Sequence, residues 1–282
     1  TLNGNNHIIK NWESTHGLFR KMNGSVKDLT IDASCSFSGS EYLAPIALSG
    51  SGSISNVHNK AKVSYSADKF SSSVAVAGIA AEFSGKVENC SNTAEITATS
   101  AGSVQGITAA GLIGKLNGKL SGSKNEGAVT VSGTFVEAES SVGGLSIVPC
   151  VGGIAGAGAS GFEIENTDNK GKVTVTFTDM SSSPKTIQRI SIGGIAGAPS
   201  GNITKCNNYG EINVKFATKD GNESSVNYIG IVGGISGGDY FTTGQNSTNI
   251  KDCVNEGKIT FHNDSNKANS AMGGIVGWPG LE

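Results

Sequence analysis

A pattern of four residues recurs along this chain: glycine, an aliphatic residue, a small or aliphatic residue, and glycine. We take the first aliphatic residue of each copy, including looser upstream copies, as a hub. The hubs are Leu18, Ile46, Ile79, Leu112, Ile154, Ile195, Ile235 and Ile275. Their spacings are 28, 33, 33, 42, 41, 40 and 40 residues, and self-similarity at such a period predicts stacked structural units.

A second motif follows each hub, an aliphatic residue and then a small or aliphatic residue three positions later. Two residues further on, six of the seven repeats place asparagine, namely Asn59, Asn92, Asn125, Asn169, Asn208 and Asn255. Asparagine tolerates the left-handed backbone conformation, and stacked asparagines can hydrogen-bond along a stack. We therefore expect a turn in this column, with left-handed asparagines and hydrogen bonds between successive repeats.

A strictly alternating segment follows the asparagine in each repeat. One face of it is apolar and begins with Val63, Ile96, Val129, Val173, Ile212 and Ile259. The interleaved residues are polar, which is the period-two pattern of a half-buried strand. Each repeat therefore predicts three strands: a glycine-flanked strand, a short strand ending at the asparagine, and the alternating strand. A variable connector leads to the next hub.

These strands predict an all-β fold, a right-handed parallel β-helix (a single-stranded β-solenoid) of about seven rungs of 28–42 residues. It forms one domain over residues 1–282, with less regular capping rungs in 1–45, repeats in 46–275 and an incomplete last rung in 276–282. The 41 glycines and the hydrophobic content of 37% suit a thin core. A flexible linker does not explain registered aliphatic columns, and a β-sandwich does not explain the constant spacing.

The glycine motif, with its trailing Gly, Ile, Cys and Asn-x-Gly positions, resembles the GLUG repeat of bacterial surface proteins, and residues 111–114 fit it best. Residues 2–11 are similar to the lead-in found before right-handed β-helices of this group. The resemblance covers nearly the whole chain. It implies a non-catalytic stalk or display module, secreted or on the bacterial cell surface, within a longer parent protein. Ala47, Leu48, Ala80 and Ala81 depart from the motif.

The charge pattern excludes one class of partner. The formal net charge is −2 and the basic residues are dispersed, so the chain lacks the electrostatic footprint that nucleic-acid phosphates require. No run of 18 apolar residues predicts a transmembrane helix. The chain opens at Thr1 without a signal peptide, and we interpret it as a mature extracellular fragment.

The cysteines are Cys35, Cys90, Cys150, Cys206 and Cys253, and three of them share one repeat column. We expect them to be small buried residues. Cys206 and Cys253 fall on consecutive rungs, and we expect a stacked thiol pair there instead of a disulfide. No spacing typical of zinc ligands occurs, so no metal or cofactor is predicted.

No catalytic constellation is visible. The histidines, His7, His16, His58 and His262, occupy different repeat positions without a nucleophile in a recognised motif. Glu88, Glu163 and Glu165 come nearest to a carboxylate cluster, and we expect them on a solvated outer face. The chain is therefore predicted not to be an enzyme. The alternative is a carbohydrate-active β-helix, similar to a polysaccharide lyase or glycosidase.

A threonine row on the alternating strands leaves a further alternative, an ice-binding face, although Asn213, Lys215 and His262 interrupt it.

The connectors are where the repeats differ, and we place them at 133–150, 179–191, 217–229 and 238–248. They carry the aromatic residues Phe135, Tyr228, Tyr240 and Phe241, and loops on a rigid scaffold are the usual site of recognition. We expect an adhesin-like module whose loops contact a host or neighbouring-cell protein or glycan. The alternative is a structural spacer that contacts nothing.

Overall fold

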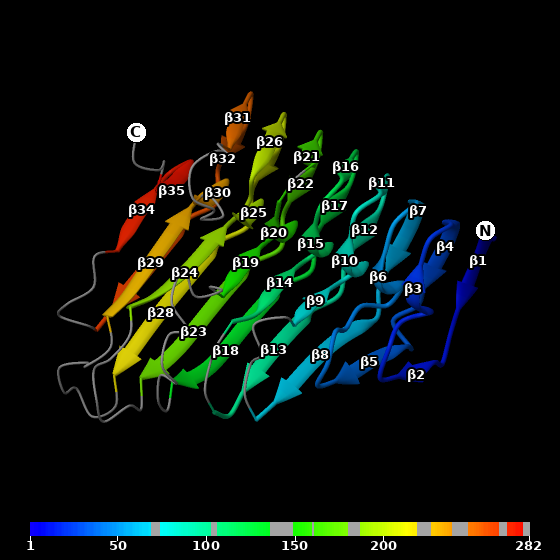
Figure 1. The fold of residues 1–282 in the computed structure, drawn as a ribbon, viewed down its shortest axis with the longest axis horizontal. Coiled ribbons are helices and arrows are strands. Elements are labelled where there is room, and N and C mark those ends of the chain that lie inside the picture. Colours follow the sequence, from blue (N-terminus) through cyan, green and yellow to red (C-terminus); the bar gives the residue numbers. More distant parts are fainter. Residues whose placement is uncertain are drawn as a thin grey trace.

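The computed structural model describes residues 1–68, 74–102, 106–135, 149–159, 161–179, 187–218, 227–238, 248–264 and 270–278. This part of the chain is all β, and every strand pairing in it is parallel. It contains no helix that is long and apolar enough to cross a membrane. Figure 1 shows the strands stacked along one axis, with β1 at one end and β34 and β35 at the other.

The strands form four sheets, which we call A to D. Sheet A holds β1 (Leu2–Ile9), β4 (Ser25–Ile31), β7 (Ser53–Asn59), β11 (Lys86–Glu88), β12 (Ser91–Asn92), β16 (Lys119–Ser121), β17 (Lys124–Asn125), β21 (Phe162–Glu165), β22 (Asp168–Asn169), β26 (Gly201–Thr204), β27 (Asn207–Asn208), β31 (Asn249–Lys251) and β32 (Val254–Asn255). Sheet B holds β2 (Glu13–Ser14), β5 (Ser36–Gly39), β8 (Lys62–Ala67), β13 (Ile96–Ser100), β18 (Val129–Phe135), β23 (Val173–Asp179), β28 (Ile212–Thr218) and β33 (Ile259–Asn263).

Sheets C and D carry the two halves of the glycine-flanked segment. Sheet C holds β3 (Phe19–Met22), β6 (Ala47–Gly50), β10 (Ala80–Phe83), β15 (Ile113–Leu116), β20 (Ala155–Gly158), β25 (Ala196–Ala198), β30 (Ser236–Gly238) and β35 (Val276–Trp278). Sheet D holds β9 (Ala75–Ala77), β14 (Thr108–Ala110), β19 (Cys150–Gly152), β24 (Ile187–Gly193), β29 (Asn227–Gly233) and β34 (Ala271–Gly273).

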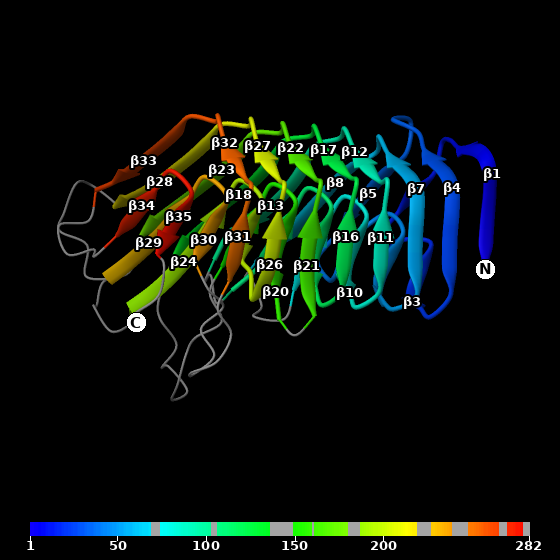
Figure 2. The same ribbon diagram turned by 90° about the horizontal axis from the view of Figure 1, so that it is seen from above.

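The chain visits the sheets in a fixed order, C, A and B, preceded from β9 onward by D, and we call one such traverse a pass. Residues 108–135 form one pass, made of β14 to β18. From β9 onward a pass therefore has five strands where the sequence predicted three, whereas the passes β3–β5 and β6–β8 have the predicted three. The glycine-flanked segment divides around the hub into β14 and β15, and the short segment divides into β16 and β17. Figure 2 shows the two ladders of sheet A side by side.

The terminal hubs depart from the predicted internal column, because Leu18 is only partly buried and Ile275 is 39% exposed. The other hubs form the column as predicted. Those from Ile46 to Ile235 are fully buried, and Ile154, Ile195 and Ile235 are joined by backbone hydrogen bonds of 3.0 Å. The alternating strands also behave as predicted, because their apolar face is buried in every pass from β8 to β28. Phe177, Phe216 and Phe261 extend this face, with ring centroids 6.2 and 5.4 Å apart.

The asparagine column differs from its prediction in one respect. Its members are absent from the described residues with positive φ, so they do not form left-handed turns. The left-handed residue lies three positions earlier and divides the ladders of sheet A. It is Asp28, Asn56, Asn89, Gly122, Asn166, Lys205 and Asp252 in successive passes, with φ between 48° and 58°.

The predicted hydrogen bonds along the stack are present. Each amide nitrogen from Asn59 to Asn208 donates to the side-chain oxygen of the next asparagine, over 2.7–2.9 Å. The same nitrogen also donates to the carbonyl two residues ahead in its own pass. We call this row the amide ladder. Both donors of each of these amides are satisfied, which is what burial of an amide requires.

Glycines beside the hubs allow the ladder to fit inside. A Cβ on Gly194 would overlap the side chain of Asn208 and the carbonyl oxygen of Gly234. Gly111, Gly153 and Gly234 face the amides of their own passes in the same way. The glycine column therefore exists because the wall at the hub and the amide ladder approach each other closely.

Candidate functional site

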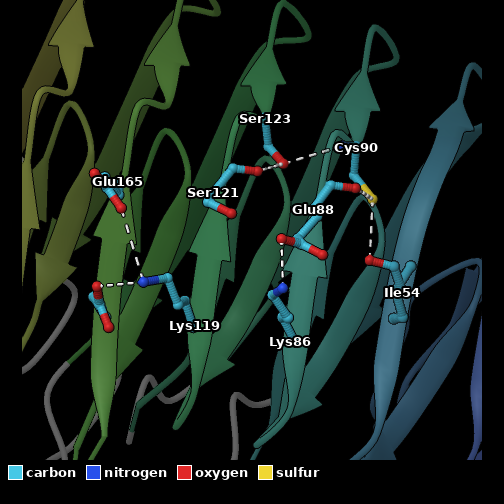
Figure 3. Close-up of polar contacts among 9 residues, drawn as sticks. Ile54, Lys86, Glu88, Cys90, Lys119, Ser121, Ser123 and Glu165 are labelled. Carbon is cyan, nitrogen blue, oxygen red and sulfur yellow. Dashed lines mark hydrogen bonds and ion pairs between the residues drawn. The ribbon is translucent and has the colours of Figure 1, made fainter.

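The carboxylates of sheet A lie on an outer face, as the sequence predicted. Lys86 Nζ lies 2.7 Å from Glu88 Oε1, and Lys119 Nζ lies 2.7 Å from Glu163 Oε1 and 3.8 Å from Glu165 Oε2 (Figure 3). Hydrogen bonding to Glu163 raises the pKa of Lys119. Each of these carboxylates thus has a lysine partner. No group of His, Cys, Asp and Glu able to hold a metal ion occurs among the described residues.

The cysteines are all free thiols, so Cys206 and Cys253 form no disulfide, as predicted. Four of the five are buried as expected, but Cys253 is partly exposed. Cys90, Ser123, Thr167, Cys206 and Cys253 share a column directly after the left-handed residue. Each side chain donates to the carbonyl two residues before it, at 2.9–3.2 Å. Each of Ser123, Thr167 and Cys253 also accepts the backbone N–H of the preceding pass, as Ser123 does from Cys90 in Figure 3.

Burial separates the thiols by reactivity. It raises the pKa of Cys90 and Cys150 to about 12, so both remain protonated at neutral pH. In the Cys206–Cys253 pair, the hydrogen bond between the thiols lowers the pKa of the less buried Cys253 and raises that of Cys206. Cys253 is therefore the thiol that ionises first.

Two of the four predicted contact aromatics lie within strands of the described chain. Phe135 is the last residue of strand β18 and Tyr228 is the second residue of β29, so both belong to strands and not to connectors. Their backbones pair in register with Asp179 and Gln188. Tyr240 and Phe241 lie outside the described residues. The connector hypothesis therefore stays a prediction.

The threonine row is aligned over three passes, because Thr97, Thr130 and Thr174 pair in register. Asn213 replaces threonine in the next pass, as noted from the sequence.

A polar groove lies where sheet C meets sheet A in the first four passes, with a volume of about 270 Å³. It is lined by Lys21, Asn23, Ser49, Gly50, Ser51, Glu82, Ser84 and Asn117. Strand pairing aligns Lys21, Ser49 and Glu82 in one row that continues to Lys115. Successive members of the row are about 4.8 Å apart, which is the spacing of paired strands.

A second row of the groove consists of Asn23, Ser51, Ser84 and Asn117, one residue from each pass. The hydroxyl of Ser51 donates to the side-chain oxygen of Asn23 at 3.5 Å. The side-chain oxygen of Asn117 accepts the N–H of Ala159 at 3.0 Å. Among the described residues, the amide nitrogens of Asn23 and Asn117 have no partner and remain available as donors.

The charges of the groove differ from those of sheet A. No ion pair within the described chain includes Lys21 or Glu82, whereas Lys86, Lys119 and Lys124 on sheet A each contact a glutamate. The backbones of Lys21 and Glu82 are separated by the Ser49 pass, or about 10 Å. Lys115, next to Glu82 in the row, lies over the ring of Tyr42, 5.7 Å from its centroid. The groove therefore offers an unpaired cation and an unpaired carboxylate.

Sequence reasoning missed this groove because its residues belong to four repeats and share no local motif. The signal was nevertheless in the repeat register. Lys21, Ser49, Glu82 and Lys115 each stand three residues after a hub, and the second row stands five residues after a hub. In the next two passes the first of these positions is Ala157 and then Ala198, so the polar row ends there.

One histidine was also underestimated. His58 Nδ1 lies 2.8 Å from Ser91 Oγ, and its Nε2 lies 3.0 Å from Asn56 Oδ1. The serine is 33 residues away in sequence and one strand away in space. The other three histidines make no comparable contact with a serine of another pass within the described chain.

Comparisons of this chain with models of known protein families, with curated proteins and with solved structures gave no match.

Proposed function

We propose that this chain is a right-handed parallel β-helix of the GLUG-repeat type. It acts as a non-catalytic, adhesin-like binding module of a bacterial surface or secreted protein. The stacked hubs, the repeated passes through four sheets and the amide ladder support the architecture. The observation that carries the binding function is the polar groove across four passes with its unpaired Lys21 and Glu82.

The lining of the groove favours a glycan as ligand over a protein. Of the eight lining residues, seven carry polar or charged side chains and the eighth is glycine. Protein interfaces depend on apolar and aromatic anchors buried at their centre, and this groove supplies none. Amides, hydroxyls and isolated charges instead match the hydroxyl groups of sugars. The ligand is therefore a hydroxyl-rich chain on a host or neighbouring cell.

The direction of the groove indicates how such a chain lies. Both rows run along the stack, with one residue of each row in every pass. One pyranose unit is about as long as the spacing between paired strands, so successive sugars meet equivalent positions of successive passes. Lys21 and Glu82 break this equivalence, because they place opposite charges two passes apart. Lys21 and Glu82 therefore determine which substituents a bound glycan carries at these two positions.

Binding without cleavage is the activity that fits the groove. Glycosidases use a pair of carboxyl groups that flank the scissile bond. Glu82 is the single carboxylate among the residues that line the groove. A carbohydrate-active β-helix is the competing proposal, and glycan cleavage by the purified chain would support it instead.

A glycan array and a panel of host matrix proteins, probed with the whole chain, test this function. We expect binding to a polysaccharide, with a loss of ten-fold or more in Glu82→Gln and Asn117→Ala. Lys119→Gln is the matched control, because it removes a charge from sheet A and should leave binding unchanged. Binding that persists in the groove variants but disappears on deletion of residues 239–247 would assign the ligand to a connector. Failure to bind any probe would favour a structural spacer.

A further inference from the structure

Four polar side chains form a hydrogen-bonded row across three passes on the outer face of sheet A. Asn56 Nδ2 donates to Asp28 Oδ1 at 2.8 Å. His58 Nε2 lies 3.0 Å from Asn56 Oδ1, and His58 Nδ1 lies 2.8 Å from Ser91 Oγ. The residues come from β4, β7 and β12. Strand β7 lies between the other two and pairs in parallel with each of them.

The contacts determine where the protons lie. Asp28 can only accept, so the amide of Asn56 must turn its nitrogen toward Asp28 and its oxygen toward His58. That oxygen requires a donor, so Nε2 of the imidazole carries the proton. Nδ1 of the neutral ring is then an acceptor, and the hydroxyl of Ser91 must donate to it.

The surroundings keep the imidazole neutral. Burial lowers the pKa of His58, and the positive charges of Lys60 and Lys124 lower it further. Asp28 is the carboxylate in the row, and the amide of Asn56 stands between it and the ring. At neutral pH His58 is therefore an unprotonated base aimed at a serine hydroxyl.

We propose that Ser91 is a base-activated nucleophile that accepts an acyl group from a small activated ester, an activity beyond the proposed glycan binding. Oγ attacks the carbonyl carbon while its proton passes to Nδ1 of His58. The ester C–O bond then breaks, the alkoxide or phenolate leaves, and the imidazolium later loses its proton to water. Asn56 is a positioning residue that holds the ring in the required tautomer, the logic of a nucleophile, a base and an orienting group.

The arrangement is specific to this part of the stack. The positions equivalent to His58 and Ser91 in other passes are Thr30, Lys124, Asp168, Asn207 and Val254. Thr30 also lies beside His58, but both ring nitrogens are taken by Asn56 and Ser91. The other positions pair no histidine with a hydroxyl, so the row is not a device that the repeat needs for stacking. Ser91 is 8% exposed, which limits the acyl donor to a small molecule.

The product is a stable acyl-serine and not an intermediate of rapid turnover. Lys124, the neighbour of Ser91 on the next pass, is 3.2 Å from Glu126, so its ammonium group is engaged by that carboxylate and is not aimed at Ser91. An acyl-transfer enzyme that loses a single oxyanion donor becomes about 10²–10³-fold slower. Because Lys124 does not serve as such a donor at Ser91, hydrolysis of the acyl group there is slow.

The test uses p-nitrophenyl acetate with the whole chain, read by release of p-nitrophenolate and by peptide mass mapping. We expect one acetyl group on Ser91, none there in Ser91→Ala, and a decrease of about 100-fold or more in His58→Gln. Ser121→Ala is the matched control and should react as the wild type does. The wild-type rate should rise with pH, with a midpoint below 6.5, the ordinary pKa of histidine.

Asn56→Asp separates activation from structural effects, because a carboxylate at Nε2 should raise the midpoint of the pH profile. Circular dichroism shows whether each variant is folded. If the His58→Gln variant does not fold, the pH profile of acetylation in the wild type still tests the proposal. Absence of acetyl-Ser91 in the wild type, acetylation that is independent of pH between 5 and 8, or unchanged acetylation in a folded His58→Gln would overturn the proposal.

Discussion

Replacement of Asn208 by alanine measures what the amide ladder contributes. Asn208 is fully buried and makes three side-chain hydrogen bonds. It accepts from Asn169 at 2.8 Å, donates to Asn255 at 2.7 Å and donates to the carbonyl of Gly210 at 3.0 Å. Asn208→Ala leaves one N–H of Asn169 without a partner and removes a donor from two acceptors.

A buried donor left unsatisfied costs about 1–3 kcal/mol, and the under-satisfied acceptors add to this. We therefore expect Asn208→Ala to lower the free energy of unfolding by about 2–4 kcal/mol, measured by urea titration with circular dichroism. Asn207→Ala is the matched control on the same strand, because Asn207 is partly exposed and its side chain makes one bond, to Asp168 at 3.0 Å. Its cost should stay below about 1 kcal/mol. Equal stabilities for the two variants would refute the assignment of this energy to the ladder.

Three further predictions concern other columns of the stack. Gly194→Ala should destabilise the chain by about 1–3 kcal/mol or more, because its Cβ would overlap Asn208 and Gly234, whereas Gly274→Ala meets nothing within 4 Å and should be neutral in the same urea titration. Iodoacetamide should label Cys253 first, and Cys206→Ala should slow that labelling near neutral pH. Labelling of Cys90 or Cys150 at the same rate in the folded chain would contradict this order. Because the pKa of His58 is lowered on folding, the unfolded chain binds more protons below pH 6.5; stability should therefore fall as pH decreases through that value, and His58→Gln should lose this part of the pH dependence.

The hub column and the alternating strands could be predicted because both depend on periodic burial, which a sequence displays directly. The hydrogen bonds between asparagines could also be predicted, since one residue type recurs at one position. The left-handed position could not. Five of its seven occupants are Asn or Asp, which tolerate this conformation, but Gly122 and Lys205 interrupt the series, and the uniform asparagine column three residues later satisfied the same rule. These residues share a place in the middle of the sheet A segment, and in three passes the residue that follows, Cys90, Ser123 or Cys206, donates its N–H to a side chain of the next pass.

The site residues were hidden for a related reason. His58 and Ser91 lie in different repeats, and their contact depends on a register of 33 residues that is correct to one position. A slip of one residue would place them on opposite faces of the strand. The groove required the same precision, since Lys21 and Glu82 are recognisable as neighbours of one row only when counted from their hubs.

The amide ladder also gives the stack an electrical direction. Every amide from Asn59 to Asn208 donates toward the next pass, and every amide from Asn92 to Asn255 accepts from the pass before, so their dipoles point the same way. The negative end lies at the oxygen of Asn59 and the positive end at the nitrogen of Asn255. Hydrogen bonds in such a line polarise one another, by perhaps 10–30% per bond. An asparagine in the middle of the line, which both donates and accepts within it, is therefore worth more than Asn59 or Asn255 at the ends, which make one such bond each.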